Sequence, residues 1–221
     1  MGIEIQVELI YSLIIMTVLS IAFIVIGNKF KKADPLQKPK GIVLLVETGI
    51  DMIYKYMSSI MPGPPRFAKN YYPYFSMLFV YVFICNISGL WGFESPTSCL
   101  SVTLALGLIT VTLIQYNSLR TNGIFAYVKN LLLPPTNILS AISPMISLSM
   151  RLFGNILAGS ILMSLVYSFT GYLSSYIIDF NFLGPIIASI LHMYFDVFAG
   201  FVQTLIFVTL SSILISLEVN T

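Results

Sequence analysis

Long apolar runs alternate with short polar segments along the chain, and this pattern predicts an all-α integral membrane protein. Residues 9–27 form an apolar run long enough to cross a hydrocarbon core of ~30 Å as one transmembrane helix. Residues 72–93 and 100–116 are two further runs, separated by a short turn at 94–96. They predict a helical hairpin over 71–116.

Two much longer apolar segments follow, at 136–170 and 185–217. As helices they would be about 50 Å long, at 1.5 Å per residue. A ~30 Å core cannot hold such helices upright, so they must be either steeply tilted or broken. Pro144 can kink the first, but the second has no proline after Pro185. We therefore predict a steeply tilted helix pair over 136–217, within a single membrane domain spanning 1–221.

Residues 41–61 mix apolar side chains with Glu47, Asp51 and Lys55, which recur every fourth residue and so share one helical face. This pattern predicts an amphipathic helix on the membrane surface. A short helix packed on another subunit fits equally well. The remaining segments are predicted to be a linker at 29–40, a break at 62–65, a return segment at 120–129 and a loop at 171–184.

Composition supports a membrane protein, since 57% of residues are hydrophobic and only 9% are charged, against about 25% in soluble domains. The placement of charge sets the topology. Ten basic residues fall in segments that can share one side: 29, 31, 32, 38, 40, 55, 66, 69, 120 and 129. The other side receives Glu4, Glu8, Glu94 and Asp179. The positive-inside rule then places the N-terminus outside and the C-terminus inside. Acidic rather than basic residues precede the first run, which indicates a transmembrane anchor and not a cleaved signal.

Arg151 is the only charged residue between Lys129 and Asp179. At membrane depth an arginine costs roughly 2.5–3.5 kcal/mol by insertion scales, so such a residue indicates function, in particular an ion path.

Two polar stripes accompany this arginine. On one helix Ser147, Arg151, Asn155 and Gly159 recur every four residues, with Ser160 next in sequence. On the last helix His192, Asp196, Gly200 and Gln203 form a second stripe at spacings of four, four and three. With Gln203 opposite Arg151, Asp196 and Ser160 would lie about 10 and 13 Å further out. The stripes predict a polar path that enters from outside and ends at Arg151. Helix–helix hydrogen bonds, or an ion pair between Asp196 and Arg151, remain alternatives.

Residues 147–159, Ser-Leu-Ser-Met-Arg-Leu-Phe-Gly-Asn-Ile-Leu-Ala-Gly, resemble the signature helix of subunit a of F-type ATP synthases. The resemblance extends to residues 198–207, Phe-Ala-Gly-Phe-Val-Gln-Thr-Leu-Ile-Phe. It also covers Asn86 with Gly89, and Pro96-Thr97 with the segment 103–106. Coverage runs from about residue 40 to the C-terminus, and the arginine motif followed by a later glutamine is highly specific.

The resemblance implies a stator that passes protons through two offset half-channels to and from a rotating c-subunit ring. It assigns Arg151 to the essential channel arginine, which attracts the ring carboxylate and blocks leak. Asn155 and Gln203 match the outer half-channel, and Ser147 matches the inner one. Arginine suits this role because its guanidinium does not deprotonate in proteins.

This sequence departs from many relatives at Ser160, where they carry glutamate or histidine. We therefore expect Asp196, assisted by His192, to carry the outer proton relay. Cys99 and Ser101 replace frequent Asp and Asn, which puts any ion-path role of the hairpin in doubt. Cys85 lies in an apolar span, and neither cysteine belongs to a CxxC pair, so we expect no disulfide or metal site.

Two other classes of membrane protein are alternatives. A secondary transporter could bind a carboxylated solute through Arg151, but paired repeats and broken helices are not evident. A membrane hydrolase or transferase would need a nucleophile–base pair, and His192 is the only histidine. No phosphate-binding motif is present, so we expect ATP chemistry to occur elsewhere in the complex.

The expected partners are the c ring, peripheral-stalk b-type subunits, membrane lipid and, indirectly, the F1 sector. We expect no cofactor, no metal, no nucleic acid and no enzymatic activity of the chain by itself. A bacterial plasma membrane fits the short loops and the absent transit peptide, and a mitochondrial inner membrane is the alternative. The sequence does not decide between H⁺ and Na⁺ as the coupling ion.

Overall fold

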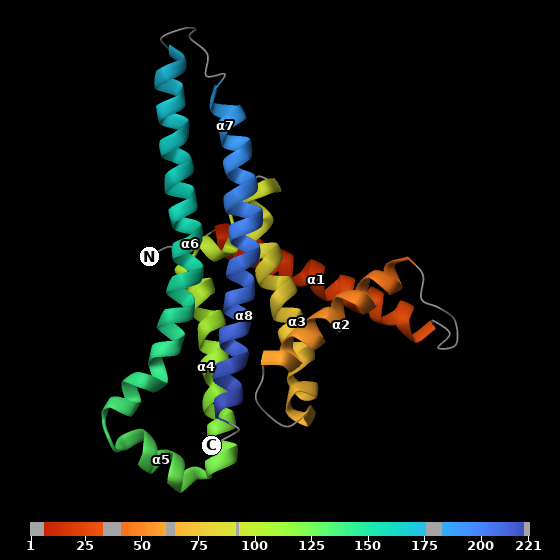
Figure 1. Cartoon of the computed structure of the whole chain (residues 1–221), viewed down its shortest axis with the longest axis vertical. Helices are drawn as coiled ribbons and strands as arrows, with labels where there is room; N and C mark the ends of the chain where they lie inside the picture. The colour runs from red at the N-terminus through yellow and green to blue at the C-terminus, as the bar shows by residue number, and fades with distance from the viewer. Residues whose placement is uncertain (1–6, 33–40, 61–64, 92, 176–182, 219–221) are drawn as a thin grey trace, which may run out of the picture.

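The structure is a computed structural model that describes residues 7–32, 41–60, 65–91, 93–175 and 183–218 (Figure 1). Within these ranges the chain forms helices and no strand. The helices are α1 Val7–Lys32, α2 Ile42–Ile60, α3 Pro65–Ile87, η1 Ser88–Trp91, η2 Pro96–Ser98, α4 Leu100–Asn122, α5 Ile124–Leu132, α6 Thr136–Ser175, α7 Leu183–His192, η3 Met193–Ala199 and α8 Gly200–Leu217.

Five helical segments of the described chain are long and apolar enough to cross a membrane. They are Val7–Lys31, Asn70–Trp91, Leu100–Asn122, Thr136–Ser175 and Gly184–Leu217. The prediction of an all-α, multi-pass membrane protein is therefore confirmed. Several helices extend beyond their predicted boundaries. The helix α1 includes residues 29–32, and α3 includes residues 65–71.

The helix α1 leaves the bundle crosswise to the long pair of α6 and α8 (Figure 1). Few of its residues are buried, and its apolar side chains are largely exposed. It packs against α3, η2 and α2, and the Ser12 and Tyr81 hydroxyls lie 2.8 Å apart between α1 and α3. A helix with so little burial depends on lipid, or on a partner, to cover its apolar surface.

The predicted amphipathic helix is α2, and it packs between α1, α3 and α8. Met57 reaches the hydrophobic core, whereas Glu47, Asp51 and Lys55 are exposed. Asp51 and Lys55 form a 2.7 Å ion pair with 54% and 75% of their side chains exposed. A pair so exposed adds little stability, so the charged face is available to other contacts.

The return segment expected at 120–129 is almost entirely helical. The helix α4 continues to Asn122, and a separate nine-residue helix, α5, occupies Ile124–Leu132. Gly123 joins them with φ +77°, a conformation that favours glycine. The apolar side chains of α5 alternate with polar ones at helical spacing, but the segment is too short for a hydropathy run to mark it.

The helices α4 and α6 pack closely against each other at Gly107, which has no side chain to separate them. A Cβ at Gly107 would collide with the Ser149 hydroxyl and would lie 2.9 Å from the backbone oxygen of Met145. Ser149 is fully buried and donates to the Thr103 carbonyl at 2.9 Å. Small residues at such a crossing allow close packing of membrane helices.

The two long segments form the pair that dominates Figure 1. The helix α6 is continuous over 40 residues, including Pro144, and is therefore about 60 Å long. The second runs from Leu183 to Leu217 as α7, η3 and α8, and it is interrupted by a π-helical segment at Met193–Ala199. Of the predicted loop at 171–184, residues 171–175 belong to α6 instead. The tilt of this pair in a bilayer stays a prediction.

Several predicted features lie outside the described residues. These are the charges Glu4, Lys38, Lys40 and Asp179 and most of the segments 29–40 and 62–65.

Candidate functional site: two cavities on either side of Arg151

Arg151 lies in the middle of α6, and its side chain is exposed. Within the described part of the chain it makes no hydrogen bond and no ion pair. It lines a cavity of about 460 Å³, the arginine cavity, together with Ser147. The other lining residues are Leu139, Ser140, Ser143, Pro144, Leu148, Leu210 and Leu214. The guanidinium therefore has no counter-ion among the described residues.

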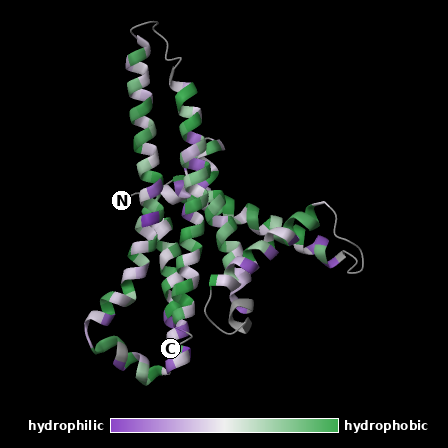
Figure 2. Ribbon diagram, viewed as in Figure 1, coloured by the Kyte–Doolittle hydropathy of each residue, from purple (hydrophilic) through white to green (hydrophobic). Residues whose placement is uncertain are grey.

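A second cavity, the carboxylate cavity, has a volume of about 500 Å³ and lies further along the helix pair. Four predicted residues line it: Asn155, Ser160, His192 and Asp196. The remaining lining residues are Glu8, Asn86, Gly89, Glu94, Ser95, Ser98, Ile156, Gly159, Met163, Ser164, Tyr167 and Phe195. The two cavities have no lining residue in common, although Arg151 and Asn155 are one helical turn apart. Figure 2 shows hydrophilic residues about halfway along the pair, with a predominantly apolar end above them.

Asp196 is paired with His192, not with Arg151. The His192 Nδ1 and the Asp196 Oδ2 lie 2.8 Å apart, and 38% and 21% of the two side chains are exposed. The Asp196 carboxylate also lies against Gly89 of η1, where an added Cβ would be 3.5 Å from Oδ2. The alternative of a structural ion pair with Arg151 is therefore not what the structure contains.

Ser160 lies across the carboxylate cavity from Asp196. Gly159 faces the neighbouring Phe195, since a Cβ at Gly159 would be 3.8 Å from the Phe195 Cβ. The Ser160 hydroxyl donates to the Leu157 carbonyl at 2.9 Å, and the side chain is exposed. The two helices thus bring residues 159–160 and 195–196 to the same level.

The π-helical segment η3 starts directly after His192 and contains Asp196. Such segments interrupt regular α-helices and occur frequently at functional sites. At its end Gly200 packs on α3, where a Cβ would lie 3.2 Å from the Asn86 Cβ. That is tighter than most Cβ contacts, so a larger residue here would require Asn86 to shift by a few tenths of an ångström.

Asn86 is a residue of the site to which sequence reasoning gave no role. It is 2% exposed and donates through Nδ2 to the Gly200 carbonyl at 3.2 Å and to the Thr204 hydroxyl at 3.1 Å. Its Oδ1 accepts from the Thr97 hydroxyl at 3.0 Å. The network fixes α3 and η2 to the last helix directly beside the carboxylate cavity.

The hairpin does contribute to the cavity, through residues other than those considered from the sequence. Cys99 is buried and Ser101 is exposed, and neither lines the cavity. Glu94, Ser95 and Ser98 line it instead. Both cysteines are buried, and neither forms a disulfide within the described part of the chain. Glu8 of α1 also lines the cavity. In the sequence, the one indication that Glu8 and Glu94 lie near each other was their predicted position on the same side of the membrane.

Gln203 is placed in the core of the bundle. Gln203 is 8% exposed, and its Nε2 has no hydrogen-bond partner in the described part of the chain. It lines neither cavity. A buried amide donor without a partner is costly.

Fold and site together define an integral membrane protein with polar cavities along a pair of long helices. The family model described as ATP synthase A chain matches residues 9–216. The chain belongs to this family, that of ATP synthase subunit a.

Individual relatives agree with this assignment. The chain is 35% identical to ATP synthase subunit a of Mycoplasma genitalium over 90% of its own length and 74% of the relative. It is 29% identical to that of Streptococcus agalactiae, over 95% and 90% respectively. It is also 29% identical to that of Chlorobium phaeobacteroides, where it covers 92% of itself and 62% of the longer relative.

Proposed function

We propose that this chain is the stator subunit of the Fo motor and passes protons to and from a ring of c subunits. The observation that carries the proposal is the position of Arg151, an exposed and unpaired cation between two cavities that share no lining residue. A fixed cation there attracts a carboxylate from the ring and repels a proton that would cross directly between the cavities. The family membership favours this function over a solute transporter or a hydrolase.

The carboxylate cavity is the entry route in this proposal. Glu8 and Glu94 at its lining attract cations, and Asn155 and Ser160 supply neutral polar groups. The His192–Asp196 pair holds the titratable groups and relays the proton toward Arg151. The arginine cavity, with Ser147, is the start of the exit route. The termini then lie with the N-terminus outside and the C-terminus inside, in a bacterial plasma membrane.

The c ring covers the exposed side of α6 in this arrangement. Large apolar residues recur at helical spacing beside Arg151 and are 40–72% exposed: Leu139, Ile142, Ile146, Met150, Leu157, Ile161 and Leu165. An apolar stripe with one unpaired cation is complementary to an apolar helix that carries one buried carboxylate. The chain itself would perform no ATP chemistry.

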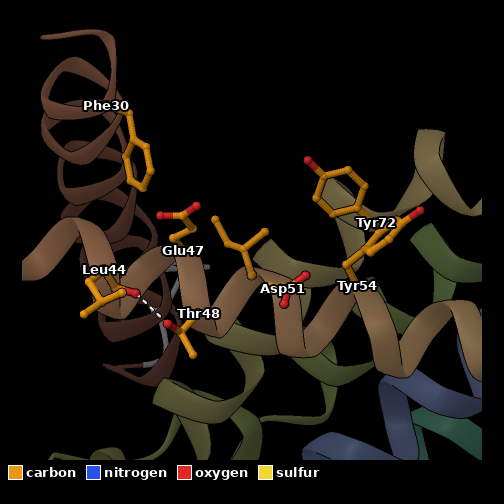
Figure 3. A pocket seen from close by; sticks show the side chains of 8 residues that line it. Phe30, Leu44, Glu47, Thr48, Asp51, Tyr54 and Tyr72 are labelled. Carbon is orange, nitrogen blue, oxygen red and sulfur yellow. Dashed lines mark hydrogen bonds between the residues drawn. The ribbon is translucent and has the colours of Figure 1, made fainter. Parts of the chain in front are cut away.

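The peripheral-stalk b-type subunits fit a different surface. A groove of about 690 Å³ lies between α1, α2 and α3 and is lined by Phe30, Glu47, Asp51, Tyr54 and Tyr72, among others. In Figure 3 the Glu47 carboxylate projects from α2 on the side of Phe30 and Tyr72, and the Asp51 carboxylate lies over the α2 ribbon. A membrane helix that docks here would bring the basic residues of its inside end to these two carboxylates.

The function is tested by reconstituting the complex with Arg151→Lys. Lysine is a point charge that loses its proton more readily when buried. We expect coupled ATP synthesis to be abolished while the complex still assembles. Arg120→Lys, at the exposed end of α4, is the matched control and should remain active. Full coupling in the Arg151→Lys complex would overturn the proposal.

A further inference from the structure

The short helix α5 carries an apolar face that the described part of the chain leaves largely uncovered. Four large side chains lie within about 100° of one another around the helix axis: Ile124, Phe125, Val128 and Leu132. They are 44–94% exposed, and Phe125 has the highest value. Single exposed apolar residues are ordinary, but four on one face of a nine-residue helix form a patch of the kind that marks a protein or membrane contact.

The other side of α5 is fixed to the bundle, so the helix cannot simply roll its apolar face inward. The Tyr127 hydroxyl donates to the Gln115 Oε1 of α4 at 2.8 Å. Tyr127 and Leu131, one helical turn apart, are both less exposed than the four apolar residues of the outer face. This side of α5 contacts α4 and α6. The outward direction of the apolar face is therefore set by the fold.

The position of α5 along the bundle is the boundary of the hydrocarbon core. The helix α4 has 23 residues and is about 34 Å long, little more than the ~30 Å thickness of the core. When α4 crosses the membrane, its last turn therefore lies at the boundary. The helix α5 begins directly after Gly123, and in Figure 1 it runs crosswise to α4. It thus follows the boundary and does not leave it.

Lys129 lies at the edge of the apolar face, about 40° beyond Phe125 around the helix axis. It is exposed and forms no ion pair with the described residues. A lysine in this position can lay its stem on the apolar surface and keep its ammonium among polar groups. Lipid headgroups provide phosphate oxygens at this depth. An apolar face with a cation at its edge is typical of a helix that lies in the membrane interface.

We propose that α5 is an interfacial helix whose apolar face is embedded in lipid, with Lys129 bound to headgroup phosphates. The partner of this surface is the bilayer, and not the c ring or a stalk subunit. Because α5 joins α4 to α6, the embedded helix holds the start of α6 at the level of the headgroups. This inference rests on the membrane crossing of α4 and not on the proposed function.

A fluorescent label on a single cysteine in the complete complex tests this position. Phe125→Cys carries the label on the apolar face, and Ala126→Cys, about 100° away on the same exposed helix, is the matched control. The complex is reconstituted into phosphatidylcholine vesicles that contain phosphatidylglycerol and lipids with brominated acyl chains, which quench the label on contact. Cys85 and Cys99 are buried, so the parent chain serves as the labelling background.

We expect the label at Phe125→Cys to be quenched by brominated lipid several-fold more than the label at Ala126→Cys. Val128→Cys gives a second site on the same face if Phe125→Cys does not assemble. Quenching by aqueous iodide instead would place the face in water. Resistance to both quenchers would place a protein partner on it. Either result overturns the inference.

The headgroup contact is tested in the same complex by changing Lys129. Lys129→Glu should lower the quenching of the Phe125→Cys label by brominated lipid, because a carboxylate is repelled by phosphate, whereas Lys129→Arg should preserve it. Equal quenching in both variants would refute the contact. The readout is the depth of α5 and not ATP synthesis, so it is independent of the outcome of Arg151→Lys.

Discussion

The His192 Nδ1 lies 2.8 Å from the Asp196 Oδ2, across the first turn of the π-helical segment and on the wall of the carboxylate cavity. The pair consists of two groups that both exchange protons, and more than a fifth of each side chain remains exposed. Of the described residues around this cavity, Glu8 and Glu94 are the other titratable carboxylates.

Asp196→Asn should strongly reduce proton-driven ATP synthesis, because asparagine keeps the shape of the side chain but cannot carry the proton. Removal of a proton-transfer group typically costs about 10²–10⁴-fold. The measurement is ATP synthesis in vesicles under an imposed gradient. Ser189→Ala, an exposed position on α7 outside the cavity, is the control. Synthesis close to that of the control would refute the relay.

His192→Gln should have a smaller effect than Asp196→Asn, because glutamine can still donate a hydrogen bond to Asp196 while losing the titratable ring. We expect synthesis to fall and its pH dependence to change, since the variant loses one of the two proton-carrying side chains of the pair. Rates measured over a pH series check this. An unchanged pH profile would assign His192 to packing.

A carboxylate moved across the cavity should restore part of the relay. Ser160 and Asp196 lie at the same level on facing helices, so Ser160→Glu should partly rescue Asp196→Asn. The double variant is compared with each single one in the same synthesis assay. Ser168→Glu, on the same helix but outside the cavity, should not rescue. Equal rescue from both positions would contradict a relay confined to this cavity.

Gly107→Val should destabilise the chain, because its side chain would collide with Ser149 and with the backbone of Met145. Overpacking of this kind costs typically about 1–3 kcal/mol. Thermal unfolding in detergent measures the loss. Gly49→Ala in α2, where nothing lies within 4 Å of an added Cβ, should leave stability unchanged or slightly raised.

Charge reversal at the groove tests the b-type partner. Glu47→Lys with Asp51→Lys should weaken co-purification of b-type subunits, because the docked helix would present its basic end to new positive charges. The fold should be unaffected, since both residues are exposed. Arg120→Glu, away from the groove, is the control. Normal recovery of b-type subunits would place them on another surface.

Most of the fold follows from the sequence, because membrane helices are marked by run length alone. The helices α1, α2, α3 and α4 and the long pair appear where hydropathy predicts them. The short helix α5 does not, since nine residues between Gly123 and two prolines leave no run to detect. The π-helical segment at Met193–Ala199 is likewise not marked in the hydropathy pattern, which runs through it without a break.

The residues of the site also fall into those that the sequence predicts and those that it does not. Helical spacing placed Asn155, Ser160, His192 and Asp196 on facing stripes, and all four line one cavity. The contribution of Asn86 depends on how α3 packs against α8, and that of Glu8 depends on the crossing of α1. Neither is encoded in the spacing of a single helix, so sequence reasoning could not assign them.

The far ends of α6 and α7 extend beyond the rest of the bundle in Figure 1. Phe169 and Tyr172 on one helix and Ile190 on the other are 60–70% exposed there. In a copy of this chain without its assembly partners, the projecting ends of α6 and α7 would be covered only by one another. We expect membrane quality-control proteases to attack such a copy first at this end, so that cellular abundance of the chain follows the supply of its assembly partners.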